Sequence, residues 1–451
     1  MNAEDVLSPR AGIAEVRWAL LDESPRKALR GAIQGLLEEG AGLRTCRLRR
    51  AKFKPGRKLT VHYDAWVRSD GRDLKRPVVA VWDREGGILG DARASALEAE
   101  AVRAGLAAPF RSLLAWLPGW NVSVRVFPLD PRFPQLIHLC DPRRVAAMLA
   151  SRLPEAFGVG YRISPIRYRP GERHVLRYEP SGAPVAPGRA VFAKLSRPDV
   201  DVARAFRVAT GVADQLDASG GATRAVRPLG VVAEDGLILF REIAGRPMSK
   251  LPRFPGGGAT GHLRRAGHAL RALHTGPAPC TEALGCRDFA TEVDAVGRAS
   301  EHLCALLPRL GAMITDTLER ARSAYDRLPS ESPTFTHGDF KADHLWVSRG
   351  GLTLLDFGSC ALGDPALDIG KFLADLQWWS ALSGRGSASA QRAFLASYAT
   401  GSEARLLRAR VYEALFLVMC AAHRVPLYHS AWAARSERLV QQAAAVLDQL
   451  P

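Results

Sequence analysis

Two aspartates, Asp339 and Asp356, stand on either side of a short segment that reads as a β-hairpin. Two apolar runs, residues 344–347 and 352–355, flank the sequence Ser-Arg-Gly-Gly, which is typical of a tight connection between antiparallel strands. A hairpin returns the chain to its starting point, so both carboxylates are expected at the same end of the ribbon. Convergent carboxylates suit a magnesium–phosphate site, because one can hold the metal through oxygen while the other accepts the proton of an attacking hydroxyl.

Three linked motifs occupy this region. They are His337-Gly338-Asp339, then Leu355-Asp356-Phe357-Gly358, and last Gly363-Asp364-Pro365-Ala366-Leu367-Asp368. In order and spacing they resemble the aminoglycoside phosphotransferase and choline kinase superfamily, which has the protein-kinase fold. The resemblance implies that Asp339 is the catalytic base, that Asp356 binds magnesium, and that Asp364 and Asp368 tie the catalytic loop to the following helix. The alternative is a solvent-facing hairpin whose aspartates only form turns.

The same resemblance assigns a nucleotide-binding role to an earlier part of the chain. It implies that Lys194, within the apolar run VFAKL, reaches the α- and β-phosphates of ATP. The turn at Arg169-Pro170-Gly171-Glu172 would lie above the phosphates, and Glu242-Ile243 would be the hinge whose backbone meets the adenine. The alternative for Lys194 is a surface lysine on an edge strand.

Three features bear on how the site would work. His344 stands where the superfamily has asparagine, so it is a candidate metal ligand beside Asp356; it could also orient Asp339, bind phosphate as a cation or simply pack. Residues 200–215 contain no glutamate to pair with Lys194. Lys341 is a candidate catalytic residue that would neutralise charge on the transferred phosphoryl group, or else a solvated loop lysine.

An internal repeat indicates how the chain is organised. Residues 52–63, KFKPGRKLTVHY, match residues 167–178, RYRPGERHVLRY, and the following strand-like segments match in the same order. Val81 aligns with Lys194, so the first copy lacks the strand-borne lysine. We therefore expect an accessory sheet domain at 1–155, a nucleotide-binding N-lobe at 156–248 and a helical C-lobe at 249–451.

The expected fold class is α+β. It is a bilobal protein-kinase-like fold, with an antiparallel-sheet N-lobe and a mostly helical C-lobe, preceded by an extra α+β domain that resembles a second N-lobe. The helical period begins at His262 and returns from Ile369 onward.

Composition narrows the range of functions. The seven cysteines are scattered and form no CxxC pair, and neither a signal pattern nor a long apolar run is present, so we expect a cytoplasmic protein with no membrane partner. The net charge of +16 attracts anions, but only residues 47–58 form a dense basic cluster. We interpret that cluster as a solvated strand-and-loop face and do not expect nucleic acid as a partner.

The expected activity is that of an ATP-dependent phosphotransferase with an alcohol group as acceptor, using ATP and Mg²⁺. The acceptor would be a sugar, an amino alcohol, an aminoglycoside or a related metabolite, with a mild preference for a neutral or anionic one because the chain is basic. A nucleotide-binding pseudokinase-like regulatory module is the alternative, and a nucleic-acid-binding protein ranks last. Residues that could line the acceptor site are Asp343, Trp378, Trp379, Glu413, His423 and Tyr428.

Overall fold

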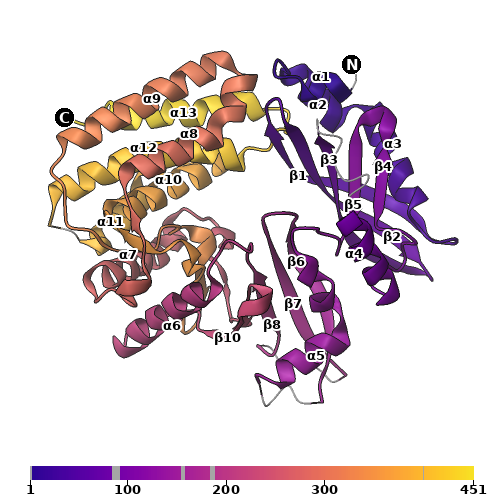
Figure 1. The fold of residues 1–451 in the computed structure, drawn as a ribbon. Helices are drawn as coiled ribbons and strands as arrows, with labels where there is room; N and C mark the ends of the chain where they lie inside the picture. The colour runs from indigo at the N-terminus through magenta and orange to yellow at the C-terminus, as the bar shows by residue number, and fades with distance from the viewer. Residues whose placement is uncertain (1–2, 84–91, 154–157, 183–187, 400) are drawn as a thin grey trace.

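The structure is a computed structural model that describes residues 3–83, 92–153, 158–182, 188–399 and 401–451. Two antiparallel sheets, in indigo to magenta, lie beside a helical part that runs from orange to yellow (Figure 1). The expected domain boundary at 155/156 falls outside the described residues. No helix in the described ranges combines the length and the apolar character needed to span a bilayer.

The first sheet is built from five antiparallel strands in the order β1-β2-β3-β5-β4. Its alternating burial follows from alternating apolar residues: Leu59, Val61 and Tyr63 of β2 are buried, whereas the intervening side chains are more exposed. Three helices precede it and one interrupts it. The elements are α1 (Ala3–Leu7), α2 (Ile13–Leu21), α3 (Glu23–Gly35), β1 (Gly42–Lys54), β2 (Lys58–Ser69), β3 (Arg72–Asp83), α4 (Ala92–Arg103), β4 (Leu114–Leu117) and β5 (Val122–Val126).

The second sheet has the same plan, with the order β6-β7-β8-β11-β10 and antiparallel pairing throughout. In both sheets a helix follows the third strand, and the fifth strand inserts between the third and the fourth. This common topology bears out the expectation of an extra domain that resembles a second N-lobe. The elements are α5 (Pro142–Ala150), β6 (Gly160–Arg169), β7 (Arg173–Ser181), β8 (Val191–Leu195), α6 (Val202–Ala218), β9 (Thr223–Ala225), β10 (Pro228–Val232) and β11 (Leu237–Arg241).

The register of the two sheets also repeats. Thr60 pairs with Val81 in the first sheet, and Val175 pairs with Lys194 in the second, as the aligned sequences require. Paired residues share a face of a sheet. We call the face that carries Lys194, and the equivalent face of the first sheet, the front face.

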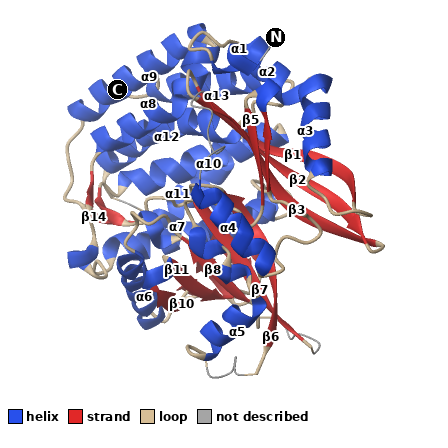
Figure 2. Cartoon of the chain, turned by 45° about the vertical axis from the view of Figure 1, so that its right-hand side comes forward, coloured by secondary structure: helices blue, strands red, loops and turns tan. Residues whose placement is uncertain are grey.

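One apolar core joins the two sheets. It contains Val79 and Val81 from the front face of the first sheet, the connecting Phe133, and Leu176 and Ala193 from the back face of the second. The sheets are therefore stacked front to back. As a result, the front face of the second sheet is the one that meets the helical part of the molecule, through Lys194 and Asp356. Figure 2 shows the strands of this sheet (β6, β7, β8, β10 and β11) in red beside the helices of that part.

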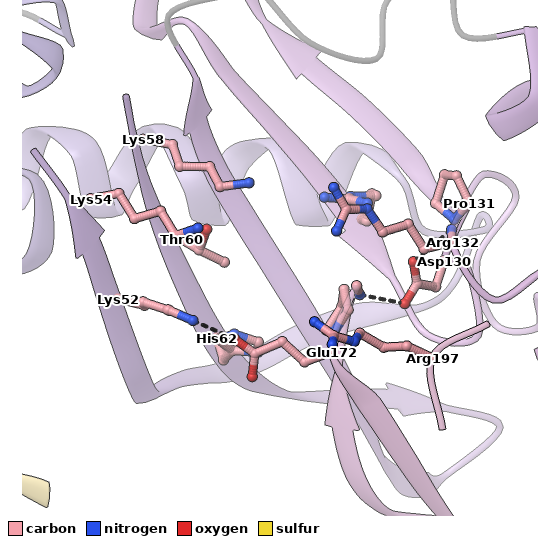
Figure 3. Close-up of a pocket in the computed structure, with 13 residues that line it drawn as sticks. Lys52, Lys54, Lys58, Thr60, His62, Asp130, Pro131, Arg132, Glu172 and Arg197 are labelled. Atoms are coloured by element: carbon pink, nitrogen blue, oxygen red, sulfur yellow. Dashed lines mark hydrogen bonds and ion pairs between the residues drawn. The ribbon is translucent and has the colours of Figure 1, made fainter. Parts of the chain in front are cut away.

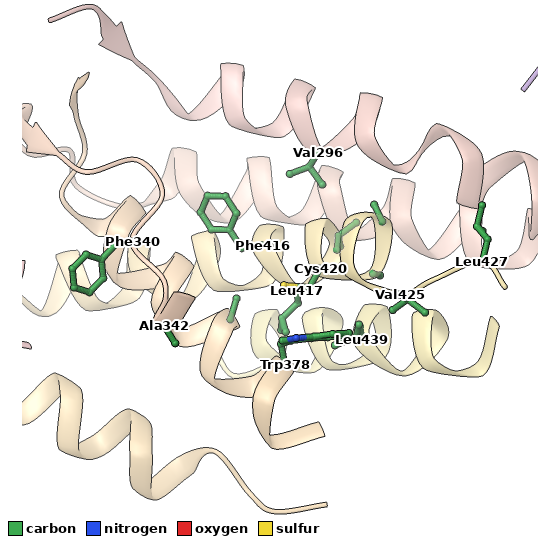
Figure 4. Packing of buried hydrophobic residues seen from close by; sticks show 14 of the residues in the cluster. Val296, Phe340, Ala342, Trp378, Phe416, Leu417, Cys420, Val425, Leu427 and Leu439 are labelled. Atoms are coloured by element: carbon green, nitrogen blue, oxygen red, sulfur yellow. The ribbon is translucent and has the colours of Figure 1, made fainter. Parts of the chain in front are cut away.

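The helical part agrees closely with the sequence pattern. Its large core is formed chiefly by α12, which packs against α10, α13 and α8 (Figure 4). Two small sheets, β12-β15-β16-β9 and β13-β17-β14, lie among the helices. The elements are β12 (Arg246–Pro247), α7 (Thr260–Thr275), β13 (Cys286–Arg287), α8 (Phe289–Leu306), α9 (Pro308–Arg327), β14 (Thr334–Thr336), β15 (Leu345–Ser348), β16 (Gly351–Leu354), β17 (Ala361–Gly363), α10 (Ala366–Ser383), α11 (Ala388–Tyr398), α12 (Glu403–Arg424) and α13 (Trp432–Leu447).

Candidate active site

The loop between β14 and β15 brings the first aspartate into place. Gly338 has a φ of +73°, and a Cβ at this position would overlap the carbonyl oxygen of Ser359, so the chain requires glycine here. His337 is fully buried, and its Nε2 lies 3.1 Å from the carbonyl oxygen of Leu355 at the end of the hairpin. The loop is thereby attached to the strand that leads to Asp356.

Two carboxylates of helix α10 hold the two ends of this loop. Asp368 accepts hydrogen bonds from the backbone N–H groups of His337 (2.6 Å) and Gly338 (2.8 Å), and Asp375 accepts one from the N–H of Ala342 (2.7 Å). Both side chains are buried. Burial acts to raise the pKa of Asp368, but the hydrogen bond and charge of His274 outweigh it and leave the pKa below its ordinary value.

Asp364, just before α10, connects the start of this helix to α9 and α12. It caps the start of α10 by accepting from the N–H of Ala366 (2.9 Å), and it also accepts from Tyr325 Oη (2.8 Å) and Arg408 Nε (2.8 Å). These partners lie on three different helices. Asp364 and Asp368 therefore make the contacts of structural residues.

Asp339 lies in a strongly cationic environment. Its Oδ2 is 2.6 Å from Lys341 Nζ, and its Oδ1 is 3.1 Å from Lys371 Nζ. Burial acts to raise the pKa of the Asp339 carboxyl, but the charges of Lys371 and Lys341 outweigh it and hold the pKa well below 3.8. The side chain is therefore ionised at neutral pH and can accept a hydrogen bond or a proton.

Asp356 meets the second sheet directly. Its backbone has a left-handed conformation, with φ of 65°, which is uncommon for a residue with a side chain and often accompanies a functional site. Its Oδ1 is 2.6 Å from Lys194 Nζ. Burial opposes ionisation of Asp356, but the Lys194 ammonium dominates and keeps the pKa of the carboxyl below its usual range.

This pair answers two questions that the sequence leaves open. Lys194 lies on β8, which is the central strand of its sheet, so the alternative of an edge-strand surface lysine is wrong. Its acidic partner, Asp356, follows the β15–β16 hairpin and does not come from helix α6. Asp201 instead caps α6 by accepting from the N–H of Arg204, and Asp214 pairs with Arg227 on the surface.

His344 lies between the two aspartates. Its Nδ1 is 3.0 Å from the carbonyl oxygen of Asp339, and its Nε2 is 3.6 Å from Asp356 Oδ2. Burial lowers the pKa of His344 to about 4, so the ring is neutral at neutral pH. A neutral ring that donates from Nδ1 to the carbonyl keeps the lone pair of Nε2 directed at Asp356.

Asp339, His344 and Asp356 together form a possible metal site. One ligand atom from each side chain lies within 4.8 Å of the others. Two carboxylates provide the hard oxygen donors that Mg²⁺ prefers, whereas the imidazole nitrogen is a poorer ligand for it. The donor set fits a divalent cation, with the carboxylates as its main support.

The residues predicted to meet the nucleotide lie at opposite ends of the strands of the second sheet. Gly171 is at the β6–β7 turn with φ of +71°, and its N–H donates to Asp130 Oδ2 (2.8 Å). Glu242 and Ile243 follow β11. The N–H of Glu242 already donates to the carbonyl of Ala190 (2.9 Å). A base at this predicted hinge would therefore have to contact the carbonyl of Glu242 or the amide of Ile243.

Lys371 is a site residue that sequence reasoning missed. Besides its contact with Asp339, its Nζ donates to the carbonyl of Gly338 (3.1 Å) and lies 4.6 Å from the centre of the Phe416 ring. The sequence does contain a signal for Lys371. Asp368, Lys371 and Asp375 are spaced at i, i+3 and i+7, so they share one face of α10. That face supports the catalytic loop.

The residues suggested for the acceptor do not gather in one place. Glu413 is fully buried and is held by Gln377 and Gln391, and Trp378 is packed in the core near Arg424 (Figure 4). Tyr428 donates to the carbonyl of Arg49 in the first sheet. Asp343 and His423 are exposed, and Asp343 accepts a hydrogen bond from Ser249.

Residues 185–412 match a family model described as the phosphotransferase enzyme family. None of the curated proteins searched matches the chain.

Solved structures with a similar arrangement include a choline/ethanolamine kinase family protein from Mesorhizobium loti, at 15% identity and a TM-score of 0.47, covering 68% of this chain and 95% of that one. A choline kinase from Cryptosporidium parvum has 10% identity and a TM-score of 0.47, covering 68% and 97%. A mutant aminoglycoside phosphotransferase in ternary complex with AMP-PNP and hygromycin B has 12% identity and a TM-score of 0.45, covering 67% and 97%.

Proposed function

The chain belongs to the phosphotransferase enzyme family, and from that premise we propose that it is a kinase that moves the γ-phosphoryl group of ATP to a hydroxyl of a small molecule. One observation carries the proposal. Asp339 and Asp356 emerge side by side from opposite ends of one hairpin, and Lys194 of the second sheet reaches the same cluster. A nucleotide held between these groups would meet a base, metal ligands and a cation at once.

Asp339 is proposed as the residue that orients the acceptor hydroxyl and takes its proton. Its low pKa makes it too weak a base to remove that proton before the reaction begins. In a loose phosphoryl transfer the proton becomes acidic only as the new O–P bond forms, and a positioned carboxylate is then sufficient. Lys341, and with it Lys371, would stabilise the negative charge around the transferred group.

Asp356 and His344 are proposed to hold the magnesium ion. The ion would supply charge neutralisation to the β- and γ-phosphate oxygens. Asp356 is suited to this role because its left-handed backbone directs the carboxylate toward Asp339 and Lys194. His344 contributes chiefly by fixing the carbonyl of Asp339 through Nδ1, since its nitrogen is a poor magnesium ligand.

The second sheet is proposed as the nucleotide-binding lobe. Lys194 would contact the α- and β-phosphates, the turn at Gly171 would cover them, and the backbone at Glu242 and Ile243 would meet the base. In this proposal residues 1–155 form the accessory domain, 156–248 the N-lobe and 249–451 the C-lobe. The seven free cysteines support a reducing, cytoplasmic location.

The acceptor is proposed to be a sugar, an amino alcohol, an aminoglycoside or a related metabolite. The pair formed by Asp343 and Ser249 supports a hydroxylated ligand, because it offers a carboxylate, four residues after Asp339, and a hydroxyl. The second candidate function is a nucleotide-binding regulatory module without fast turnover. The observation that favours it is the 2.6 Å contact of Lys194 with the carboxylate that would hold the metal.

A phosphotransfer assay with Asp339→Asn tests the proposal. Wild-type protein is incubated with ATP, magnesium and a panel of sugars, amino alcohols and aminoglycosides, and ³¹P NMR locates the phosphate on the product. We expect Asp339→Asn to lower kcat by about 10²–10⁴-fold, because a positioned base contributes that much, and chelation of magnesium to abolish turnover.

The matched control is Asp316→Asn, which removes an exposed carboxylate from α9 and should leave turnover unchanged. Undiminished turnover by Asp339→Asn would show that Asp339 is not the base. A wild type whose melting temperature rises with Mg-ATP, but which phosphorylates nothing in the panel, would favour the regulatory module.

A further inference from the structure

A basic cavity lies outside the proposed catalytic cluster, which we define as Lys194, Asp339, His344 and Asp356. It has a volume of about 600 Å³ and is bounded on one side by β1 and β2 of the first sheet and on the other by the β6–β7 turn of the second. Figure 3 shows Lys52, Lys54 and Lys58 extending from one wall toward Arg132, Glu172 and Arg197 on the other. This size is typical of a small-molecule pocket.

The cavity lies on the front face of the first sheet, the face that in the second sheet carries Lys194. Strand pairing places Lys54 opposite Lys58 and Lys52 opposite Thr60, on the same side as Val81. The residues that align with Lys52, Lys54 and Lys58 in the second sheet are Arg167, Arg169 and Arg173. Both copies thus present three cations around a Pro-Gly turn on the front face.

Most of the positive charge in this cavity is uncompensated. Among the described residues, the side chains of Lys54, Lys58 and Arg132 have no acidic partner, and the buried Nε of Arg125 has no hydrogen-bond acceptor. Burial lowers the pKa of the Lys54 ammonium, and the like charges of Lys52 and Lys58 lower it further. Lys54 and Lys58, within the basic segment expected to be solvated, are partly exposed and lie among like charges.

The two carboxylates of the cavity are already engaged with its walls. Asp130 accepts from the N–H of Gly171 and contacts His174 Nε2, both at 2.8 Å. Glu172 lies 2.6 Å from Lys52 Nζ and 3.7 Å from an Arg50 nitrogen. Burial acts against the charge of Glu172, but Lys52 and Arg50 still lower its pKa to about 2, so Glu172 acts as an internal anion for part of the cluster.

We propose that this cavity binds a compact anion that carries two or more phosphoryl groups. The cations of both walls supply more positive charge than one phosphoryl group carries, which favours a ligand with several. No phenylalanine, tyrosine or tryptophan is found among the described lining residues, and cations predominate there, so the site is suited to the phosphates more than to a base. This inference goes beyond the proposed catalytic function and does not depend on it.

Binding would be coupled to the β6–β7 turn. A phosphoryl group that contacts Lys52 competes with Glu172, which is next to Gly171 in that turn. The domain of the first sheet also contacts the C-lobe, because Arg17 of α2 donates to the carbonyl of His429 (3.4 Å) and Tyr428 donates to the carbonyl of Arg49 in β1 (2.9 Å). An anion in the cavity therefore acts on a domain that contacts both lobes.

Titration calorimetry with inorganic tripolyphosphate, without magnesium, tests the proposal on the full chain. We expect wild-type protein to bind it and Lys54→Ala/Lys58→Ala to bind at least about 10-fold more weakly, since one charged hydrogen bond accounts for that factor. The control Lys27→Ala/Arg72→Ala removes the same charge from exposed sites of the same domain. It should change affinity less than about 2-fold, because salt screens exposed charges.

Three outcomes would overturn the proposal. They are an absence of binding by the wild type, an equal loss in the control pair, and a loss caused by Lys194→Ala while Lys54→Ala/Lys58→Ala binds normally, which would place the anion in the catalytic cluster. Glu172→Gln supplies a second measurement that does not depend on the lysine variants. Because it removes the internal competitor for Lys52, affinity should rise by about 3–10-fold, and an unchanged affinity would contradict the coupling.

Discussion

The two sheets share strand order, register and a cationic turn, yet their front faces meet different surroundings. The front face of the second sheet is opposite the catalytic loops, where Lys194 finds Asp356. The front face of the first sheet is partly covered by the second sheet, and Val81 is buried at the position equivalent to Lys194. The basic tip around Lys54 and Lys58 lines an accessible cavity.

This difference shows that the shared topology places cations at equivalent positions of the two sheets. It does not determine which groups those cations contact. Six of the nine lysines in the chain lie in these two places: Lys194, Lys341 and Lys371 at the catalytic cluster, and Lys52, Lys54 and Lys58 at the basic cavity. The first group is paired with carboxylates suited to hold a metal. The second group faces mainly other cations, which suits an anion that arrives with its own charge.

The largest expected difference between the sheets is in catalysis. Lys194→Met removes the ammonium from the catalytic cluster, and we expect kcat/KM for ATP to fall by about 10²–10³-fold, as for the loss of one charge-stabilising donor. Val81→Ala changes the equivalent position of the first sheet. It should cost about 1–2 kcal/mol of folding stability from lost burial and leave kcat/KM nearly unchanged.

Steady-state kinetics and thermal unfolding of both variants provide the measurement. Normal kinetics in Lys194→Met would remove this lysine from the site. A loss of catalysis in Val81→Ala as large as that in Lys194→Met would mean that the first sheet takes part in the reaction, contrary to the comparison.

A smaller expected difference lies in pH dependence. His62 occupies the position that aligns with Arg177, and burial together with the charge of Arg50 lowers its pKa to about 4. Because the pKa of His62 is lower in the folded chain, the unfolded chain binds a proton at a higher pH than the folded chain does. The free energy of unfolding therefore decreases as the pH falls from 6.5 to about 4. The loss is up to about 3 kcal/mol for this one group.

Melting temperature measured against pH in that window checks this expectation. His62→Gln should flatten the wild-type decline. Arg177→Gln is the matched variant, because a guanidinium stays charged throughout, and it should shift the curve without changing its slope between pH 6.5 and 5. A His62→Gln curve parallel to that of the wild type would contradict the assignment.

The smallest expected effects concern the two Pro-Gly turns. Gly56 and Gly171 have φ of +67° and +71°, so alanine at either position should cost about 1–2 kcal/mol through backbone strain. A Cβ on Gly171 would also press on Arg132 Cδ at 3.2 Å. We expect Gly171→Ala to raise KM for ATP several-fold and Gly56→Ala to leave it unchanged. Equal changes in KM would show that the two turns do not differ in function.

Much of this protein could be predicted from local patterns. The hairpin between Asp339 and Asp356 follows from two apolar runs and a glycine turn, and the start of α10 follows from Pro365. The duplicated sheet follows from one repeated turn and its flanking strands. Each of these signals acts over a few residues, and neighbouring residues along a chain cannot be far apart in space.

What needed the folded chain were the partnerships between distant segments. Lys194 and Asp356 are 162 residues apart, and Lys52 and Glu172 are 120 apart, so no local pattern joins them. Whether a cation faces a metal-binding carboxylate or another cation depends on how the sheets stack and on which face stays open. Packing of the whole molecule decides that, because burial and charge depend on all the groups that surround a site.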